Sequence, residues 1–351
     1  MIQLIKINDN RWNEIVYSFT NYDTYYTKEY VQSFCLNEDG TPFLIFFRTE
    51  NVRLCYPIME KDISNFAPFR GLIENNRYFD WNTPYGYGGP LSNRDLTNCE
   101  QELFFEELKA IAKERNVVSQ FIRFHPMIKN QNVCKDVIEN IYLKDTIYID
   151  LNNNEDLMNQ MDGKNRNLIR KAIKNGVSVF HDKGDNLSDF INIYNETMVR
   201  DCARDFYFFS QEYYQFLKEY MSEQIEFFYA VKDDVIVAAS IFFILNGQMH
   251  YHLSGNLVEY RTFAPTNLLL YEAAKWGREN GCFSLQLGGG VGIEDSLFHF
   301  KKQFNKNGRV GFFLGRNIFD KEKYDMLLSV RKENDINFDI NNTYYIQYRK
   351  P

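Results

Sequence analysis

The sequence lacks several signals that assign a protein to a common class. Its six cysteines are scattered and none forms a C-x-x-C pair, which argues against a zinc knuckle or a redox pair. No stretch approaches the roughly 20 consecutive apolar residues of a transmembrane helix. The amino-terminal MIQLIKINDNRW has no long apolar segment of the kind found in secretory signals. We therefore expect a cytoplasmic protein with reduced thiols and no membrane span.

An excess of positive charge is also missing. The net charge is −7 at pH 7, which argues against a globally basic DNA-binding protein and leaves room only for a local basic patch. Hydrophobic residues make up 44% and charged residues 25%, as in folded globular proteins. The chain has 24 Tyr, and because a phenol offers both packing and a hydrogen bond, so many Tyr indicate clefts as well as cores.

Metal and dinucleotide motifs are absent as well. His250 and His252 alternate on an expected strand, but no carboxylate or thiolate accompanies them at ligand spacing, so we expect no metal site. The loop Gly288–Gly292 follows a strand. It lacks the full helix and the acid about 20 residues further on that a dinucleotide fingerprint requires.

What the sequence does contain is an internal repeat. Tyr26–Phe34 resembles Phe209–Leu217 at an offset of 183 residues, and the second residue of each segment, Thr27 or Ser210, is a plausible helix cap. The same offset relates two expected β-hairpins, with turns at Asn51 and Asp234. Further on, the offset shortens to 165, which indicates an insertion in the first half at about 63–81.

The repeat predicts an α/β protein with two tandem domains, each a mixed twisted sheet flanked by helices. We expect the first domain at 1–148 and the second at 149–351. Only the second half joins a glycine loop to Phe300-Lys301, so we expect the chemistry of the protein there. The first domain then forms a non-catalytic wall of the substrate cleft.

A basic helix is expected between the two halves. Leu168 and Ala172, like Ile169 and Ile173, are four residues apart, and Gly176 is a natural stop. A solvated helix face is one interpretation. Because the chain is acidic overall, an acid-free run also indicates a phosphate-bearing ligand or RNA. The five cations of this run are Lys164, Arg166, Arg170, Lys171 and Lys174.

Three segments together resemble the FemABX family, tandem-domain members of the GNAT acyltransferase superfamily. They are the basic run 164–177, the strand Tyr251-His-Leu-Ser-Gly255, and Leu287-Gly-Gly-Gly290 followed by Phe300-Lys301. The best-known members of the family transfer an amino acid from aminoacyl-tRNA to the peptide stem of a peptidoglycan precursor. In the first half, Pro84–Pro90 is similar to the family's Gly-Pro loop.

The resemblance implies a set of site residues. Lys301 matches the lysine near the reactive end of the donor, where a cation stabilises the tetrahedral oxyanion. Tyr251 is a second catalytic candidate, and no Ser-His-Asp or Cys-His motif is needed for transfer to an amine. Arg204 and Tyr207 suit a phosphate-sugar substrate, although a capping arginine and a core tyrosine explain them equally well. The remaining substrate-binding candidates are His252, Phe300, Tyr85 and Tyr87.

The donor is expected to be aminoacyl-tRNA, bound through the basic helix 164–174, with no permanent cofactor. Relatives that bind acetyl-CoA have a glycine loop at a helix N-terminus that holds pyrophosphate. This chain has Glu259–Asn267 there, without glycine and with Pro265. The expected acceptor is an amine of a phosphate-bearing cell-wall or glycan-linked precursor. Two alternatives stay open: an acetyl-CoA-dependent N-acetyltransferase of a sugar or small amine, and a non-catalytic protein that binds a glycan or RNA.

Overall fold

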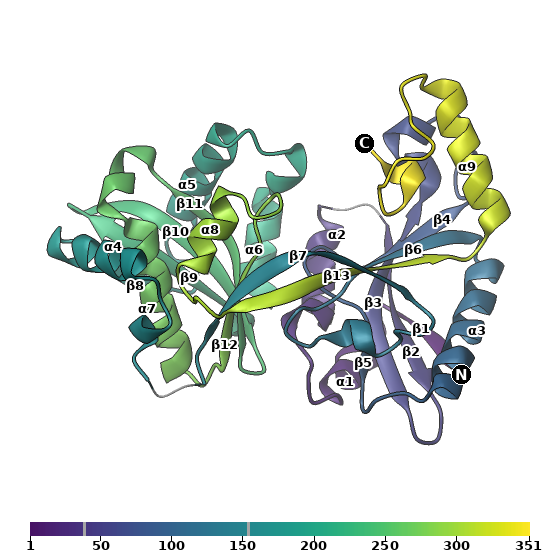
Figure 1. Ribbon diagram of the computed structural model, residues 1–351, viewed down its shortest axis with the longest axis horizontal. Coiled ribbons are helices and arrows are strands. Elements are labelled where there is room, and N and C mark those ends of the chain that lie inside the picture. Colours follow the sequence, from purple (N-terminus) through teal and green to yellow (C-terminus); the bar gives the residue numbers. More distant parts are fainter. Residues whose placement is uncertain (38–39, 153–154) are drawn as a thin grey trace. The chain divides into compact units, whose positions relative to one another are not determined.

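The computed structural model describes residues 1–351 except 38–39 and 153–154. The chain forms two compact units. Unit 1 contains Met1–Leu143 and Phe312–Pro351, and unit 2 contains Lys144–Gly311. Each unit has a mixed sheet with flanking helices (Figure 1), so the expected α/β class is confirmed. No helix among the described residues is both long enough and apolar enough to span a bilayer.

Unit 1 has one parallel strand pair in an otherwise antiparallel sheet. Its strands are β1 (Ile2–Lys6), β2 (Thr41–Arg48), β3 (Arg53–Asp62), β4 (Phe79–Asn82), β5 (Leu91–Ser92), β6 (Val117–Arg123) and most of β13 (Arg309–Ile318). Its α-helices are α1 (Arg11–Tyr17), α2 (Lys28–Cys35), α3 (Asn98–Glu114) and α9 (Lys321–Asn334). The sheet order is β1-β2-β3-β4-β6-β13, with β5 on β3, and the parallel pair is β4 with β6.

Unit 2 follows the same plan. Its strands are β7 (Glu139–Asp150, which enters from unit 1), β8 (Ser178–Asp182), β9 (Ile225–Lys232), β10 (Val235–Leu245), β11 (Gln248–Asn256) and β12 (Ser284–Gly288). Its helices are α4 (Gly163–Lys174), α5 (Leu187–Arg200), α6 (Gln211–Tyr220), α7 (Pro265–Glu279) and α8 (Ser296–Lys302). The sheet order is β7-β12-β11-β10-β9-β8, and the parallel pair is β11 with β12.

The duplication is confirmed element by element. The order β1-α1-α2-β2-β3-β4-α3-β6-β7 recurs as β8-α5-α6-β9-β10-β11-α7-β12-β13, with β5 added in the first copy and α8 added in the second. The Oγ atoms of Thr27 and Ser210 accept hydrogen bonds from the backbone N–H three residues on, each at 3.3 Å. The turn Asp233–Asp234 has φ of 51° and 60°, which gives a two-residue hairpin loop the twist of its strands.

The expected insertion lies between β3 and β4. There, residues 63–78 include the 3₁₀ turns η2 (Ile63–Asn65) and η3 (Ala67–Phe69). In the second copy only Asn246 and Gly247 join β10 to β11, and both have positive φ, as a tight turn requires. The insertion therefore adds surface to unit 1 alone.

The last strand of each copy completes the sheet of the other unit. β7 ends the first copy and pairs with β12, whereas β13 ends the second copy and pairs with β6. The compact units therefore differ from the ranges expected from the sequence, 1–148 and 149–351. The physical reason is that β13, α9 and the C-terminal segment pack on the first sheet, where Tyr324 and Tyr348 join one core cluster with Val118.

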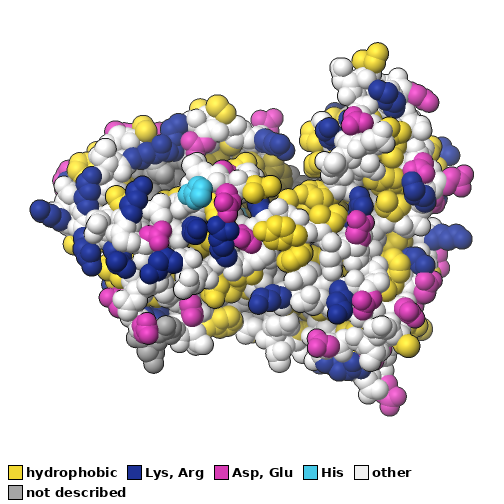
Figure 2. All heavy atoms as spheres, in the orientation of Figure 1, with side chains coloured by type: hydrophobic (Ala, Val, Ile, Leu, Met, Phe, Trp, Pro, Cys, Tyr) yellow, Lys and Arg dark blue, Asp and Glu magenta, His cyan; other side chains and the backbone are white. Residues whose placement is uncertain are grey.

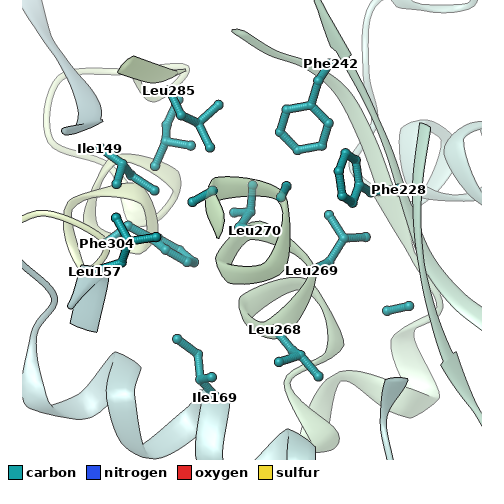
Figure 3. Packing of buried hydrophobic residues seen from close by; sticks show 14 of the residues in the cluster. Ile149, Leu157, Ile169, Phe228, Phe242, Leu268, Leu269, Leu270, Leu285 and Phe304 are labelled. Atoms are coloured by element: carbon teal, nitrogen blue, oxygen red, sulfur yellow. The ribbon is translucent and has the colours of Figure 1, made fainter. Parts of the chain in front are cut away.

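The core of unit 2 is built around α7 (Figure 3). Leu269 and Leu270 are fully buried there and pack in one cluster with Phe228 and Phe242 from the sheet. Ile169 of α4 enters the same cluster, which anchors the basic helix to the unit. Burying each such side chain stabilises the fold by about 1.5–3 kcal/mol. This packing fixes the strand ends at which the candidate site lies.

Candidate active site in the second unit

The candidate site lies where β11 and β12 part. Their parallel pairing extends over three residue pairs and ends at His250 opposite Gln286. β11 continues to Asn256 beside β10, and a β-bulge interrupts that pairing next to Tyr251. Bulges re-aim side chains and are enriched next to active sites. Tyr251 is therefore the first residue of β11 beyond its pairing with β12.

The glycine loop after β12 is shaped by close approach. A Cβ at Gly290 would collide with the Asp295 carboxylate, and one at Gly289 would lie 3.0 Å from the Asp145 carbonyl oxygen. Asp295 caps α8, because its carboxylate accepts hydrogen bonds from Phe298 N–H at 2.8 Å and from Gly292 N–H at 2.7 Å. The glycines thus let the loop fold back on the start of α8, which sets the position of that helix.

Lys301 is held beneath this loop. It lies in the last turn of α8 with only 8% of its surface exposed, and its Nζ donates to the Gly289 carbonyl oxygen at 2.8 Å. The same Nζ is 5.7 Å from the ring centroid of Tyr251, so the structure brings these two candidates together. Burial, with help from the charge of Lys144, lowers the pKa of Lys301 to about 8. A buried ammonium of this kind stabilises a developing oxyanion better than one in water does.

Lys144 on β7 is a second cation at the loop. Its Nζ donates to the carbonyl oxygens of Gly290 at 2.5 Å and Val291 at 3.1 Å. Burial lowers the pKa of Lys144 too, while the charge of Asp295 opposes this change. Sequence reasoning missed Lys144, because nothing in the chain around it marks a site. Only the pairing of β7 with β12 brings it to the loop.

Tyr251 and His252 lie on opposite sides of β11. Tyr251 packs against the core cluster that contains α7, and burial raises the pKa of its phenol, although hydrogen bonds with Ser254 and Ser240 partly oppose the rise. His252 instead has its Nε2 2.8 Å from the Tyr213 hydroxyl and its ring 4.3 Å from that of Phe243. Burial, followed by the charge of His250, lowers the pKa of His252 to about 3. His252 is therefore neutral at physiological pH.

The other candidates of unit 2 have different environments. Arg204 is exposed in the segment between α5 and α6, and its carbonyl oxygen accepts from Tyr207 N–H at 2.9 Å. Tyr207 is half-buried, and its carbonyl oxygen accepts from the Tyr194 hydroxyl at 2.9 Å. Phe300 packs on the core, with its ring 5.5 Å from that of Phe304. Arg204 is thus available to a ligand, whereas Phe300 also anchors α8.

Tyr85 and Tyr87 belong to an aromatic cluster of unit 1. The Tyr85 carbonyl oxygen accepts from the Tyr30 hydroxyl at 2.7 Å. The ring of Tyr87 is 5.3 Å from that of Tyr25 and 5.4 Å from that of Phe312. Both side chains are half-buried. Their expected role in substrate binding stays a prediction.

The basic helix forms as expected. Gly176 follows α4 with φ of 74°, the left-handed conformation that ends many helices. Arg166 is half-buried and donates to the Met161 carbonyl oxygen at 3.1 Å, so it has a structural contact. The other four cations are exposed, and no carboxylate in the described part of the chain forms an ion pair with them. Figure 2 shows Lys and Arg side chains gathered over this end of unit 2.

The start of α7 bears on the donor. Ala264 precedes the helix with φ of 56°, and its N–H donates to the Arg261 carbonyl oxygen at 3.0 Å. Pro265, the first residue of the helix, has no N–H. Two of the backbone donors that would otherwise point at a pyrophosphate at this helix end are therefore used or absent.

Comparisons with known proteins agree with this fold. Residues 163–302 match the model of the family described as "Acetyltransferase (GNAT) domain". No curated protein matches the sequence. The structure of FemX is similar at a TM-score of 0.69 and 16% identity, over 93% of this chain and 99% of that one.

Two further solved structures are similar at lower scores. L-PGS from Bacillus licheniformis has a TM-score of 0.55 and 12% identity, over 94% of this chain and 98% of that one. The C-terminal domain of a putative lysylphosphatidylglycerol synthetase from Agrobacterium fabrum has a TM-score of 0.54 and 12% identity, over 91% of this chain and 93% of that one. The likeness to FemX confirms the expected FemABX-like fold of two tandem GNAT-like domains. Residues 163–302 are thus similar to a GNAT acetyltransferase domain, and the chain shares the tandem fold of FemX.

Proposed function

We propose that this protein transfers an aminoacyl group from aminoacyl-tRNA to an amine of a phosphate-bearing cell-wall or glycan-linked precursor. In this reaction an uncharged amine attacks the ester carbonyl, the C–N bond forms, and the C–O bond to the tRNA ribose breaks. The proton lost by the amine leaves with the ribose oxygen or to solvent. The tetrahedral intermediate between these two events carries an oxyanion, and the enzyme must stabilise its negative charge.

The observation that carries the proposal is the environment of Lys301. A buried lysine whose pKa is about 8 remains mostly protonated at neutral pH, and it lies beside a glycine loop and next to Tyr251. An ammonium fixed there supplies positive charge where the oxyanion would develop. Lys144 adds a second positive charge at the same loop. Arg204, exposed between α5 and α6, suits the phosphate of the acceptor.

Two observations favour tRNA as the donor. The exposed cations of α4 offer contacts to a phosphate backbone. At the start of α7, Ala264 and Pro265 offer no free N–H to a pyrophosphate. In addition, a lysylphosphatidylglycerol synthetase, by its name, joins an amino acid to a phospholipid, and one such putative enzyme shares this fold. The proposed donor thus fits both the charge of the helix and the backbone of the loop.

A second candidate is an N-acetyltransferase that uses acetyl-CoA and acts on a sugar or small amine. The description of the matching family model, an acetyltransferase domain, favours it. Both candidates place the reaction beside Tyr251 and use the same lysine, Lys301. They differ in the donor.

The test measures both donors on the purified full-length protein. We expect a charged tRNA to bind in a mobility-shift assay, and acetyl-CoA to give no micromolar binding by calorimetry. Micromolar binding of acetyl-CoA without binding of tRNA would establish the second candidate instead. Binding of neither donor would leave a non-catalytic protein that recognises a glycan or RNA.

The role of Lys301 has its own measurement. Acyl transfer to a panel of amino sugars and soluble peptidoglycan precursors is followed with labelled donor. We expect Lys301→Ala to lower turnover about 100-fold, the effect of losing one oxyanion-stabilising group. Circular dichroism and the unfolding midpoint show whether the fold is intact, and Lys306→Ala, an exposed lysine of the same unit, is the matched control. Unchanged turnover in the Lys301 variant would remove this residue from the site.

A further inference from the structure

Unit 1 contains a cavity that the acyl-transfer chemistry does not use. Its volume is about 720 Å³, enough for a mononucleotide-sized ligand, within the range of small-molecule sites. Three parts of unit 1 form it: the insertion after β3, the strands β4 and β6, and the C-terminal segment around η9 (Gln347–Arg349). We call it the Arg123 pocket, and its lining residues include Phe66, Arg70, Phe121, Arg123, Tyr344 and Arg349.

The charged residues that line the Arg123 pocket all have the same sign. Lys61, Arg70, Arg123 and Arg349 line it, and no Asp or Glu lies among the described residues of its wall. This is unusual for a chain whose net charge is −7. Buried Asp80 neutralises Arg349, because its carboxylate accepts from Arg349 Nε at 2.7 Å. The positive charge that an anion would balance is therefore that of Arg70 and Arg123.

Arg70 and Arg123 make only weak contacts of their own. Arg70 is exposed and donates to the Asn65 carbonyl oxygen at 3.3 Å, and Arg123 donates to the Thr83 carbonyl oxygen at the same distance. Neither forms an ion pair with a carboxylate in the part of the chain that the structure describes. A guanidinium has five N–H donors, so both keep donors for a ligand. Phosphate is the anion that such donors bind in bidentate geometry.

Aromatic rings alternate with these cations. Phe66, Phe121, Tyr344 and Tyr345 line the pocket. The Arg123 guanidinium lies 5.0 Å from the ring centroid of Phe121, and that of Arg349 lies 5.1 Å from the ring of Phe66. Tyr344 is 40% exposed, which leaves its ring face available. Rings and guanidinium planes together are a surface on which a nucleobase stacks.

The pocket wall is held in place by a buried network. Asp80 accepts from the hydroxyls of Tyr348, at 2.5 Å, and Ser119, at 2.8 Å, in addition to Arg349. Tyr348 is fully buried. Arg331 donates to the carbonyl oxygens of Tyr348 and Lys350, both at 2.9 Å. The C-terminal segment is thus fixed before any ligand arrives, which lowers the entropic cost of binding.

From these observations we propose that the Arg123 pocket binds a nucleotide carrying a 5′-phosphate or diphosphate. The phosphate lies against Arg70 and Arg123, and the base stacks on the aromatic side of the wall. The inference does not rest on the proposed acyl transfer, because every residue that carries it lies in unit 1. It assigns unit 1 a ligand of its own, and it gives the insertion and the C-terminal segment a shared role.

Calorimetry on the full-length protein tests the proposal with four probes: ADP, UDP, inorganic pyrophosphate and uridine. We expect micromolar affinity for at least one of the two nucleoside diphosphates. Pyrophosphate should bind at least about tenfold more weakly because it cannot stack, and uridine should not bind measurably because it has no phosphate. Absence of submillimolar binding by both diphosphates would overturn the proposal. Equal binding of pyrophosphate would overturn the nucleotide assignment.

Variants separate the two parts of the pocket. Arg70→Gln and Arg123→Gln should each weaken nucleotide and pyrophosphate about tenfold or more. Tyr344→Ala should weaken the nucleotide and leave pyrophosphate unchanged. Arg48→Gln, an exposed arginine elsewhere in unit 1, is the matched control, and it should bind like the wild type. Lys301→Ala should also bind nucleotide like the wild type. Wild-type affinity in both arginine variants would show that the ligand binds elsewhere and would overturn the assignment.

Discussion

At the scale of single residues, the proposed chemistry depends on one buried charge. Lys301 is largely shielded from water, and Lys144 adds a like charge nearby. Both effects favour the neutral amine, so the pKa is lowered to about 8 from 10.5. A group with this pKa changes protonation close to physiological pH. The pH dependence of the reaction should therefore report on Lys301 directly.

Replacing Lys144 should move that pH dependence. Lys144→Met removes the like charge, so the pKa of Lys301 rises and the corresponding limb of the pH–rate profile moves to higher pH. A limb that falls with pH shows that Lys301 acts protonated, as an oxyanion stabiliser. A rising limb shows that it acts as a base. The measurement is kcat/KM for acyl transfer from pH 6 to about 10, a range that spans the altered and ordinary pKa of lysine.

Lys306→Met is the matched control, because it removes an exposed lysine of unit 2 without touching the loop. Its profile should match that of the wild type. An unmoved limb in Lys144→Met would mean that Lys144 does not act through Lys301. Loss of rate at every pH without a shift would indicate a purely structural contact with the carbonyl groups of Gly290 and Val291.

The sequence could predict part of this site and not the rest. Lys301 and Tyr251 were marked by a resemblance, and the structure places them 5.7 Å apart. Lys144 carries no local mark, because it reaches the loop only through the pairing of β7 with β12. The Arg123 pocket combines an insertion with the C-terminal segment, so no single stretch of sequence predicts it.

At the scale of elements, hairpins and helices were predictable because their signals are local. The turn Asp233–Asp234 and the cap Ser210 each act within a few residues. The exchange of β7 and β13 between the two sheets was not predictable, since periodicity identifies a strand but not its partner. For that reason the sequence did not indicate that Phe312–Pro351 join the first compact unit.

One close approach between elements gives a stability prediction. Gly255 on β11 lies against α5, and a Cβ there would be 2.6 Å from the Ile193 carbonyl oxygen and 2.8 Å from Tyr194 Cα. Because backbone atoms cannot yield as a side chain can, Gly255→Ala should lower the free energy of unfolding by about 1–3 kcal/mol. Urea unfolding measures this as a lower midpoint at an unchanged slope.

Gly163→Ala is the control for that substitution. The nearest atom to a Cβ there is the end of the Arg166 side chain at 3.7 Å, and the residue lies in the first turn of α4. Alanine should therefore be neutral or stabilise the protein by up to about 1 kcal/mol. Equal midpoints for the Gly255 and Gly163 variants would show that α5 moves away from β11 without cost.

At the scale of the whole molecule, charge is unevenly distributed. The chain carries −7, yet α4 exposes Lys164, Arg170, Lys171 and Lys174 without an acidic partner among the described residues. Like-charged side chains one turn apart destabilise a helix slightly. A polyanion that neutralises them releases its own counterions, which makes binding steeply dependent on salt. The salt dependence of tRNA binding is therefore the property that tests whether this helix is an RNA-binding surface.

Neutralising the three exposed lysines of α4 should reduce the salt dependence of tRNA binding by an amount that reflects the number of lost phosphate contacts. We expect Lys164→Gln, Lys171→Gln and Lys174→Gln together to lower the slope of log K against log salt for tRNA binding by about 2–3, since each lost phosphate contact removes about 0.7–0.9. The matched control replaces the exposed Lys321, Lys332 and Lys350 of unit 1 with Gln, which changes the net charge equally. If both triple variants lose the same slope, net charge rather than α4 governs the binding. If neither triple variant loses slope, the helix does not contact the RNA, and its cations form only a water-exposed helix face.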